Sequence, residues 1–236
     1  MKDGKLVVYG DVGQTFMYGA KGGVAYIMGN AAGRPLINAV GKPRVVVNGT
    51  ALDYLAESFM AGDPLNGGGF VVLNGIGFDD HDESIREYES PYPGSNIFSL
   101  ASGGAIYVRD PHRKLVDEQL NGGEFVNMTD ADWKLIQPYL EENERLFDVT
   151  IDRLLTVHGK KADPKDVYRK IAPKKTVLAE DYGGLVEWEG SELSGEEKRL
   201  LAARRRRKQR AGKQDKAAPV EGAGEEEDYV PAIWRI

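Results

Sequence analysis

The residues with the clearest capacity for chemistry lie in one short acidic stretch, Asp79-Asp-His-Asp-Glu83. Carboxylates are ligands for hard cations, so this stretch raises the hypothesis of a metal site. It lacks both the ligand spacing and the glycine hinge of a calcium-binding loop. We therefore favour a solvated loop over a metal site.

The rest of the chain offers few groups for catalysis. Cysteine is absent, which excludes disulfides, thiol nucleophiles and cysteine-ligated zinc or iron–sulfur centres within the chain. The three histidines, His81, His112 and His158, are far apart in the sequence and have no spacing typical of a metal site, so we expect them at the surface. We predict no catalytic, cofactor-binding or metal-binding residue here.

The elements that would have to position such groups are short hydrophobic runs bounded by turn-forming residues. Each run has strand length and is rich in β-branched and aromatic residues. The runs are Lys5–Tyr9, Val24–Met28, Arg44–Asn48, Phe70–Asn74 and Ala105–Arg109. Every run except the last ends at a glycine, and the last ends at Asp110.

The spacing of these runs is regular at first. Gly10, Gly29 and Gly49 are spaced by 19 and then 20 residues, and the later steps lengthen to 26 and about 35 as insertions enter. One β-rich run per repeat of this size is typical of a solenoid, because stacked coils bury a continuous core that a single coil cannot form. We predict an all-β fold, a β-helix. An ordinary sandwich or barrel fits less well, since hairpin signals such as Asn-Gly lie at the wrong distances.

Across these repeated runs the chain resembles the GXGXG domain, the right-handed parallel β-helix at the C-terminal end of the glutamate synthase large subunit. The segments that carry the resemblance are Gly10–Gly13, Gly19–Gly23, Ile27–Asn30, Asp53–Glu57, Met60–Gly62 and Val71–Gly75. The likeness covers about 110 positions. It implies a right-handed β-helix over residues 1–127, and it is more specific to the fold than to any reaction.

Four stretches need separate interpretation. Residues 50–62 fit either a coil with a half-buried edge or a short helix. Residues 76–102 depart from the repeat spacing of the β-rich runs, so we predict that they form an insertion that loops out of the solenoid. Gly122–Asn127 is interpreted as a last coil edge, and Asp166–Pro173 resembles the tail of the same domain.

A helix is predicted after the β-rich runs. Thr129 is a suitable N-cap, and Asp130 and Asp132 would lie in the first turn, where the helix dipole favours anions. An apolar stripe follows at Trp133, Ile136, Leu140 and Phe147, although Pro138 should kink or split the helix. We expect residues 128–175 to form a helical cap on the open end of the solenoid.

The last segment, residues 176–236, is predicted to be a charged, extended tail. It holds a basic run within Glu196–Lys208, an acidic run at Glu225–Asp228 and the apolar end Tyr229–Ile236. Three interpretations remain open: nucleic-acid contact, an arm on a partner subunit with Trp234 and Ile236 as anchors, or a solubilising tail. We prefer the arm.

Charge and hydrophobicity restrict the partners and the cellular location that we expect for the protein. The net charge of −6 argues against general nucleic-acid affinity, since phosphate binding requires a basic face. There is no run of 18 apolar residues and no signal peptide, so we expect a cytoplasmic protein without membrane contact.

The resemblance implies a function in an assembly. Glutamate synthases need an amidotransferase cysteine and a barrel that holds FMN and an iron–sulfur cluster, and this chain supplies neither. We expect a non-catalytic structural subunit, with FMN and the cluster in partner chains: an amidotransferase subunit and an FMN-binding synthase subunit. The open β-helix end near Lys5–Tyr9 and the tail would join a hetero-oligomer.

Two other functions remain open. The first is a scaffold subunit of another redox complex, similar to the β-helix subunit of formylmethanofuran dehydrogenase. The second is a β-helix enzyme acting on polysaccharide. The second fits less well, because the acids between the runs do not recur at coil spacing.

Overall fold

The computed structural model describes residues 1–78 and 85–174, which belong to one compact unit spanning Met1–Lys175. The acidic stretch Asp79–Glu83 and the tail predicted over residues 176–236 lie outside the described residues.

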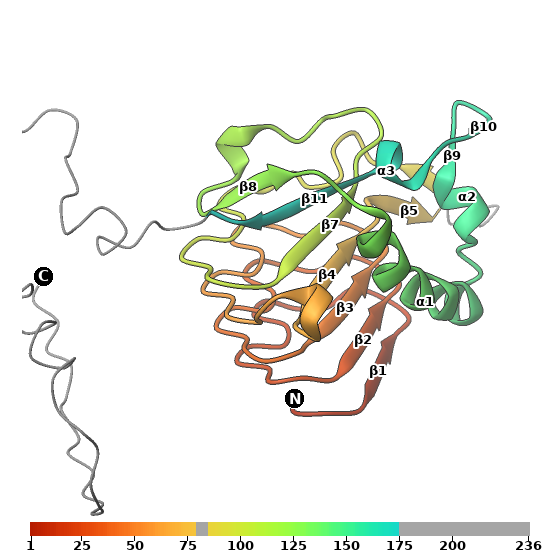
Figure 1. Ribbon diagram of the computed structural model, residues 1–236. Coiled ribbons are helices and arrows are strands. Elements are labelled where there is room, and N and C mark those ends of the chain that lie inside the picture. Colours follow the sequence, from red (N-terminus) through yellow and green to blue (C-terminus); the bar gives the residue numbers. More distant parts are fainter. Residues whose placement is uncertain (79–84, 175–236) are drawn as a thin grey trace, which may run out of the picture. The chain divides into compact units, whose positions relative to one another are not determined.

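Five parallel strands stack in sequence order and form one wall of a solenoid of about three turns (Figure 1). They are β1 (Lys5–Val8), β2 (Val24–Ile27), β3 (Arg44–Val47), β4 (Phe70–Leu73) and β7 (Ala105–Arg109). Their register aligns Val8, Ile27, Val47, Leu73 and Val108. The all-β β-helix predicted from the sequence is thus confirmed.

From β2 to β7 the strand wall is largely buried on both faces, while β1 at the start of the stack is partly exposed. One set of alternating side chains points into the solenoid, including Ala25, Val45, Val71 and Ile106. The other set points outward and forms a second core with the helices, including Tyr26, Val46, Val72 and Tyr107. Because both faces are covered, the strands have continuous apolar runs in place of the alternation typical of a half-exposed sheet.

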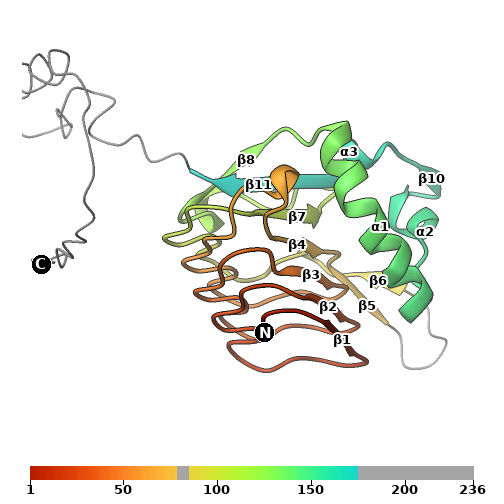
Figure 2. The same ribbon diagram turned by 60° about the horizontal axis from the view of Figure 1, so that its bottom comes forward.

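Helix α1 (Asp130–Phe147) covers the outer face of this wall (Figure 2). Its first turn contacts β7 through Tyr107 and Asp132, and its last turn reaches the start of the stack, where Phe147 packs edge-on against Tyr9. Thr129 caps the helix as predicted. Pro138 does not split it, since the helix is continuous over 18 residues.

Strand β11 (Tyr168–Pro173) closes the end of the strand wall beyond β7. It pairs antiparallel with β7 on one side and with β8 (Gly123–Val126) on the other. The expected helical cap over residues 128–175 therefore differs from the structure: a strand covers the edge of β7, while α1 lies across the sheet. A strand can satisfy the free N–H and C=O groups of that edge, which a helix cannot. The predicted last coil edge at Gly122–Asn127 is likewise an antiparallel strand.

The opposite wall of the solenoid has an unusual backbone. Left-handed conformations recur at alternate positions in each coil, such as Arg34, Leu36 and Asn38. The equivalent non-glycine positions in the other coils are Thr15, Met17, Tyr54, Ala56, Ser58, Asn96, Phe98 and Leu100. Hydrogen bonds between coils accompany this conformation, for example from Arg34 N to Asp53 O at 2.8 Å. Residues 50–62, for which a helix was one alternative, form part of this wall.

The remaining elements lie around this frame. A hairpin of β5 (Ile76–Phe78) and β6 (Ile85–Glu87) follows β4, in agreement with the start of the insertion predicted over residues 76–102. The end of that stretch does not loop out: Phe98 N donates to Leu55 O at 3.1 Å, and Ile97 and Phe98 pack in the solenoid core, because this segment stacks on the coil before it. The shorter elements are η1 (Pro64–Asn66), η2 (Asp117–Gln119), α2 (Ile151–Leu155), β9 (Thr156–Val157), β10 (Lys160–Lys161) and α3 (Pro164–Val167). Across residues 1–78 and 85–174, no helix is long and apolar enough to span a membrane.

Candidate functional site

Buried polar side chains follow the carboxyl ends of the parallel strands. Asn48 and Asn74 come directly after β3 and β4, and Arg109 ends β7. The Asn74 amide donates to Asn48 Oδ1 at 2.9 Å, and Tyr168 Oη donates to Asn74 Oδ1 at 2.9 Å. Arg109 Nε donates to Leu154 O at 2.7 Å. Other protein groups supply the hydrogen bonds of these buried side chains. The side chains therefore connect strands and helices and have few donors or acceptors left for a ligand.

Asp132, in the first turn of α1, is a fully buried acid. It accepts hydrogen bonds from Tyr107 Oη at 2.7 Å, Lys170 Nζ at 2.6 Å and Thr129 N at 2.9 Å. Burial opposes ionisation, but the hydrogen bonds from Lys170, Thr129 and Tyr107 outweigh it and hold the pKa of Asp132 below its usual value. Burial and the same carboxylate raise the pKa of Tyr107. This cluster binds helix to sheet.

Two of the histidines meet in space. The rings of His112 and His158 have centroids 5.0 Å apart, and His112 Nε2 lies 3.1 Å from Glu87 Oε2. Glu87 also pairs with the buried guanidinium of Arg109 at 2.6 Å. Burial opposes ionisation of Glu87, but Arg109 and His112 together hold its pKa below the usual value. Both histidines are exposed, as expected; their proximity was not.

These side chains do not form a metal centre. Within the part of the chain that the structure describes, no three His, Asp or Glu side chains are arranged to hold a metal ion. His81 and the acidic stretch around it fall outside that part.

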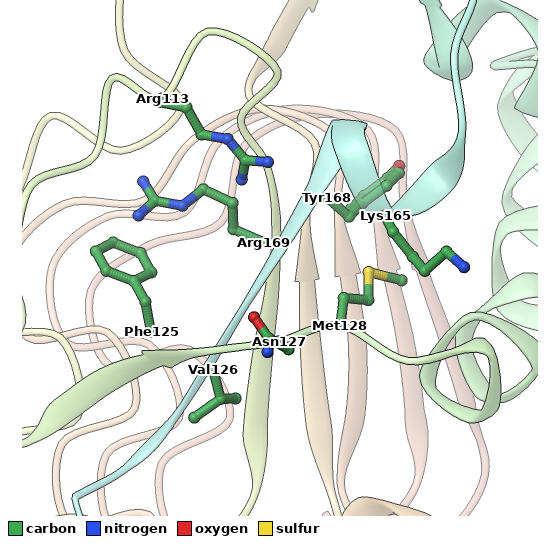
Figure 3. Close-up of a pocket in the computed structure, with 8 residues that line it drawn as sticks. All are labelled: Arg113, Phe125, Val126, Asn127, Met128, Lys165, Tyr168 and Arg169. Carbon is green, nitrogen blue, oxygen red and sulfur yellow. The ribbon is translucent and has the colours of Figure 1, made fainter.

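A pocket of about 300 Å³ lies where β8 and β11 meet the loop that follows β7. Its lining combines three cationic side chains with apolar and aromatic ones (Figure 3). The lining residues are Arg113, Phe125, Val126, Asn127, Met128, Lys165, Tyr168 and Arg169. Lys165 is paired with Asp130 at 2.9 Å, and both of these side chains are substantially exposed.

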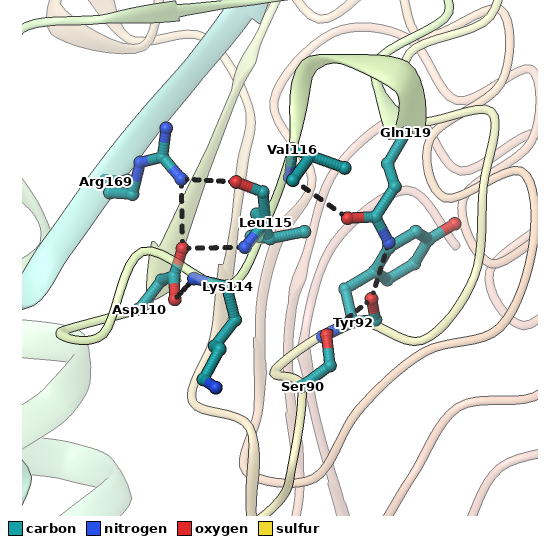
Figure 4. Close-up of polar contacts among 8 residues, drawn as sticks. All are labelled: Ser90, Tyr92, Asp110, Lys114, Leu115, Val116, Gln119 and Arg169. Atoms are coloured by element: carbon teal, nitrogen blue, oxygen red, sulfur yellow. Dashed lines mark hydrogen bonds and ion pairs between the residues drawn. The ribbon is translucent and has the colours of Figure 1, made fainter.

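A buried carboxylate fixes one of the pocket's arginines (Figure 4). Asp110 accepts hydrogen bonds from the backbone N–H groups of Lys114 at 2.7 Å and Leu115 at 3.1 Å. It also accepts from Arg169 Nη1 at 3.0 Å, and the same nitrogen donates to Leu115 O at 2.8 Å. The Arg169 guanidinium lies over the Phe125 ring, with Cζ 3.4 Å from the centroid. Arg169 is thereby held in one orientation at the pocket wall.

Sequence reasoning missed this pocket. Arg113 and Arg169 belong to segments 56 residues apart in the chain, and no local motif links them. The weak available signal was Asp110, which stands where the other coils have glycine. Its carboxylate organises the following loop and so brings the two segments together.

A family model described as the GXGXG motif matches residues 1–169, which include the parallel strands, α1 and the start of β11. No curated protein matches the chain.

Proposed function

The chain belongs to the GXGXG motif family, and we propose that it is a non-catalytic structural subunit of a glutamate synthase-type oxidoreductase complex in the cytoplasm. The family match over residues 1–169 is the observation that carries this proposal. In the proposed complex, this chain spaces an amidotransferase subunit and an FMN-binding synthase subunit. Holding two sites at a fixed distance is a contribution to catalysis, because it keeps an intermediate close to its next reaction.

The internal packing supports a scaffold role. The solenoid interior is filled by apolar side chains such as Phe59, Phe98 and Ile106. Among the described residues, Arg44 Nε is the one buried side-chain polar atom without a hydrogen-bond partner. A solenoid with a filled core and hydrogen-bonded polar groups resists deformation. It can therefore hold two bound subunits at a fixed distance, as a spacer must.

The unpaired edge of β1, at the start of the stack, supports the proposed contact with a partner chain. Strand β1 pairs with β2 and, within the described residues, with no other strand. Gly4 O and Val8 O accept hydrogen bonds from β2, so strand alternation directs the polar groups of Lys5 and Val7 toward the open edge. Tyr9 is 70% exposed and Leu6 is 38% exposed beside this edge. An open edge with apolar neighbours is a surface on which another chain can add a strand.

Native purification tests the proposal. The protein is isolated under mild conditions from the cells that make it, the co-purifying chains are identified, and the absorbance spectrum is recorded. An amidotransferase chain that begins with cysteine, together with a flavin band, is the expected result. Recovery of a colourless protein without partners would contradict the proposal.

The same experiment distinguishes the alternative scaffold role. In a complex of the formylmethanofuran dehydrogenase type, the partners would carry molybdenum or tungsten in place of FMN. Elemental analysis of the purified assembly separates the two, since FMN-containing chains need neither metal.

A further inference from the structure

We propose that the pocket between β8, β11 and the loop after β7 binds a small organic anion through a carboxylate or phosphate group. This inference goes beyond the scaffold role and does not depend on it, because all the lining residues belong to this chain. The recognition elements are Arg113 and Arg169, with Lys165 at the far side.

Arg113 provides the unneutralised charge. Its side chain is exposed, lines the pocket and forms no ion pair with any side chain in residues 1–78 or 85–174. Its backbone is left-handed, with a φ of 55°, although it lies outside the repeating wall. Non-glycine residues rarely adopt this conformation, and such positions cluster at binding sites. The conformation aims the guanidinium into the pocket (Figure 3).

Arg169 provides a preorganised donor. Asp110 and Leu115 occupy its Nη1 alone, and the side chain is only 16% exposed. No acceptor among the described residues engages its Nε or Nη2. A guanidinium held on the Phe125 ring loses little further freedom when it binds an anion, which favours affinity. The fork geometry of arginine suits the two oxygens of a carboxylate or phosphate.

The distribution of charges around the pocket favours an anion at Arg113 and Arg169. Asp110 pairs with Arg169, and Lys165 lies near Asp130, Asp163 and Asp166, so Arg113 is the lining cation that no carboxylate of the described residues pairs with. Arg113 and Arg169 also line the same small space, where like charges repel. An anion between them would relieve this repulsion and add charge-assisted hydrogen bonds.

The size and walls of the pocket limit the ligand. A volume of about 300 Å³ lies at the low end for small-molecule sites, which points to a compact molecule. Met128, Val126 and Phe125 supply apolar surface beside the cationic groups. We therefore assign the site to a compact acid with a short apolar body.

Calorimetric titration of the full chain with inorganic phosphate, and separately with succinate, tests this assignment at low ionic strength. Saturable binding of at least one probe is expected, with a Kd of about 1 mM or tighter, weakening as KCl is added. The variant Arg113→Asn should bind at least about tenfold more weakly, since it loses a charge-assisted hydrogen bond. Asparagine tolerates the left-handed backbone, so this variant keeps the fold.

Arg34→Asn is the matched control. Arg34 is also an exposed arginine with a left-handed backbone, φ of 60°, but it lies in the repeating wall and pairs with Glu57. The Arg34→Asn variant loses the same charge as Arg113→Asn does. It should bind phosphate and succinate with the affinity of the unmodified protein. Thermal melting of both variants verifies that they are folded. Absence of binding by both probes, or equal affinity in Arg113→Asn, would overturn the proposal.

Discussion

Asn48 and Asn143 exchange two hydrogen bonds between their side-chain amides across the interface of sheet and helix. Asn48 Nδ2 donates to Asn143 Oδ1 at 3.0 Å, and Asn143 Nδ2 donates to Asn48 Oδ1 at 2.9 Å. Both side chains are fully buried. Through Asn74 and Tyr168 the same network reaches β4 and β11, so one chain of amides connects the helix to three strands.

This relationship predicts a stability cost for Asn143→Ala. The change removes both hydrogen bonds and leaves part of the buried Asn48 amide without a partner, so we expect a loss of about 2 kcal/mol in the free energy of unfolding. Urea denaturation followed by circular dichroism measures it. The control Lys134→Ala, at an exposed position of the same helix, should change stability by less than about 0.5 kcal/mol. Equal effects of the two variants would contradict a role for the amide pair.

Gly29 and Gly49, which close two of the coils, are predicted to be required because a side chain there would collide with the preceding coil. A Cβ added at Gly49 would lie 2.6 Å from Gly29 O, because the backbones of successive coils approach closely there. We expect Gly49→Ala to destabilise the protein by about 1–3 kcal/mol through overpacking. At Gly13 a Cβ would meet nothing within 4 Å, so Gly13→Ala should be nearly neutral. Thermal melting of the two variants compares them, and similar melting temperatures would refute the close-approach explanation.

Asp132 is predicted to make stability depend on pH. Its pKa in the folded protein is held below the ordinary value of 3.8, so the folded state releases this proton more readily than the unfolded chain does. The resulting stabilisation is present above that ordinary value and is lost as the pH falls through the lower folded-state pKa. Unfolding free energies measured from about pH 7 to about pH 3 should show the unmodified protein losing its advantage over Asp132→Asn.

A surface carboxylate provides the control for this titration. Asp152 is 70% exposed and pairs with Lys161 on the surface. Asp152→Asn should therefore follow the pH profile of the unmodified protein. If Asp132→Asn does the same, the buried carboxylate does not contribute to the acid sensitivity.

The open edge of β1 gives a prediction for assembly. Val7→Pro removes an N–H group that faces away from β2, so the fold should tolerate it, while a strand added at this edge would lose a hydrogen bond and meet the proline ring. We expect the variant to melt normally but to co-purify with far less of its partner chains. Val7→Thr keeps the N–H group and a similar shape and should retain them. Undiminished recovery with Val7→Pro would place the partner elsewhere.

Local features of the fold could be predicted from the sequence. The strands at Val24–Ile27 and Arg44–Val47 follow from β-branched runs that recur after 20 residues, and the start of α1 follows from Thr129. Each signal lies within a few residues of the structure it specifies, because strand propensity, glycine spacing and helix capping act through neighbouring atoms.

The left-handed positions of the opposite wall could not be predicted in this way. Residues such as Leu36, Ala56 and Phe98 have no local preference for that conformation. Hydrogen bonds from the coils above and below stabilise it, such as the one from Leu36 N to Phe16 O at 2.7 Å. Only the stacking of coils makes these bonds available.

The sequence by itself determined the repeating coil, its glycine turns and the existence of a helix after it, since these depend on contacts between near neighbours. The tertiary structure decided where that helix lies, that β11 closes the end of the wall, and that Arg113 meets Arg169. Those outcomes depend on polar groups distant in the chain, such as Asn48 and Asn143, finding partners that no local pattern records.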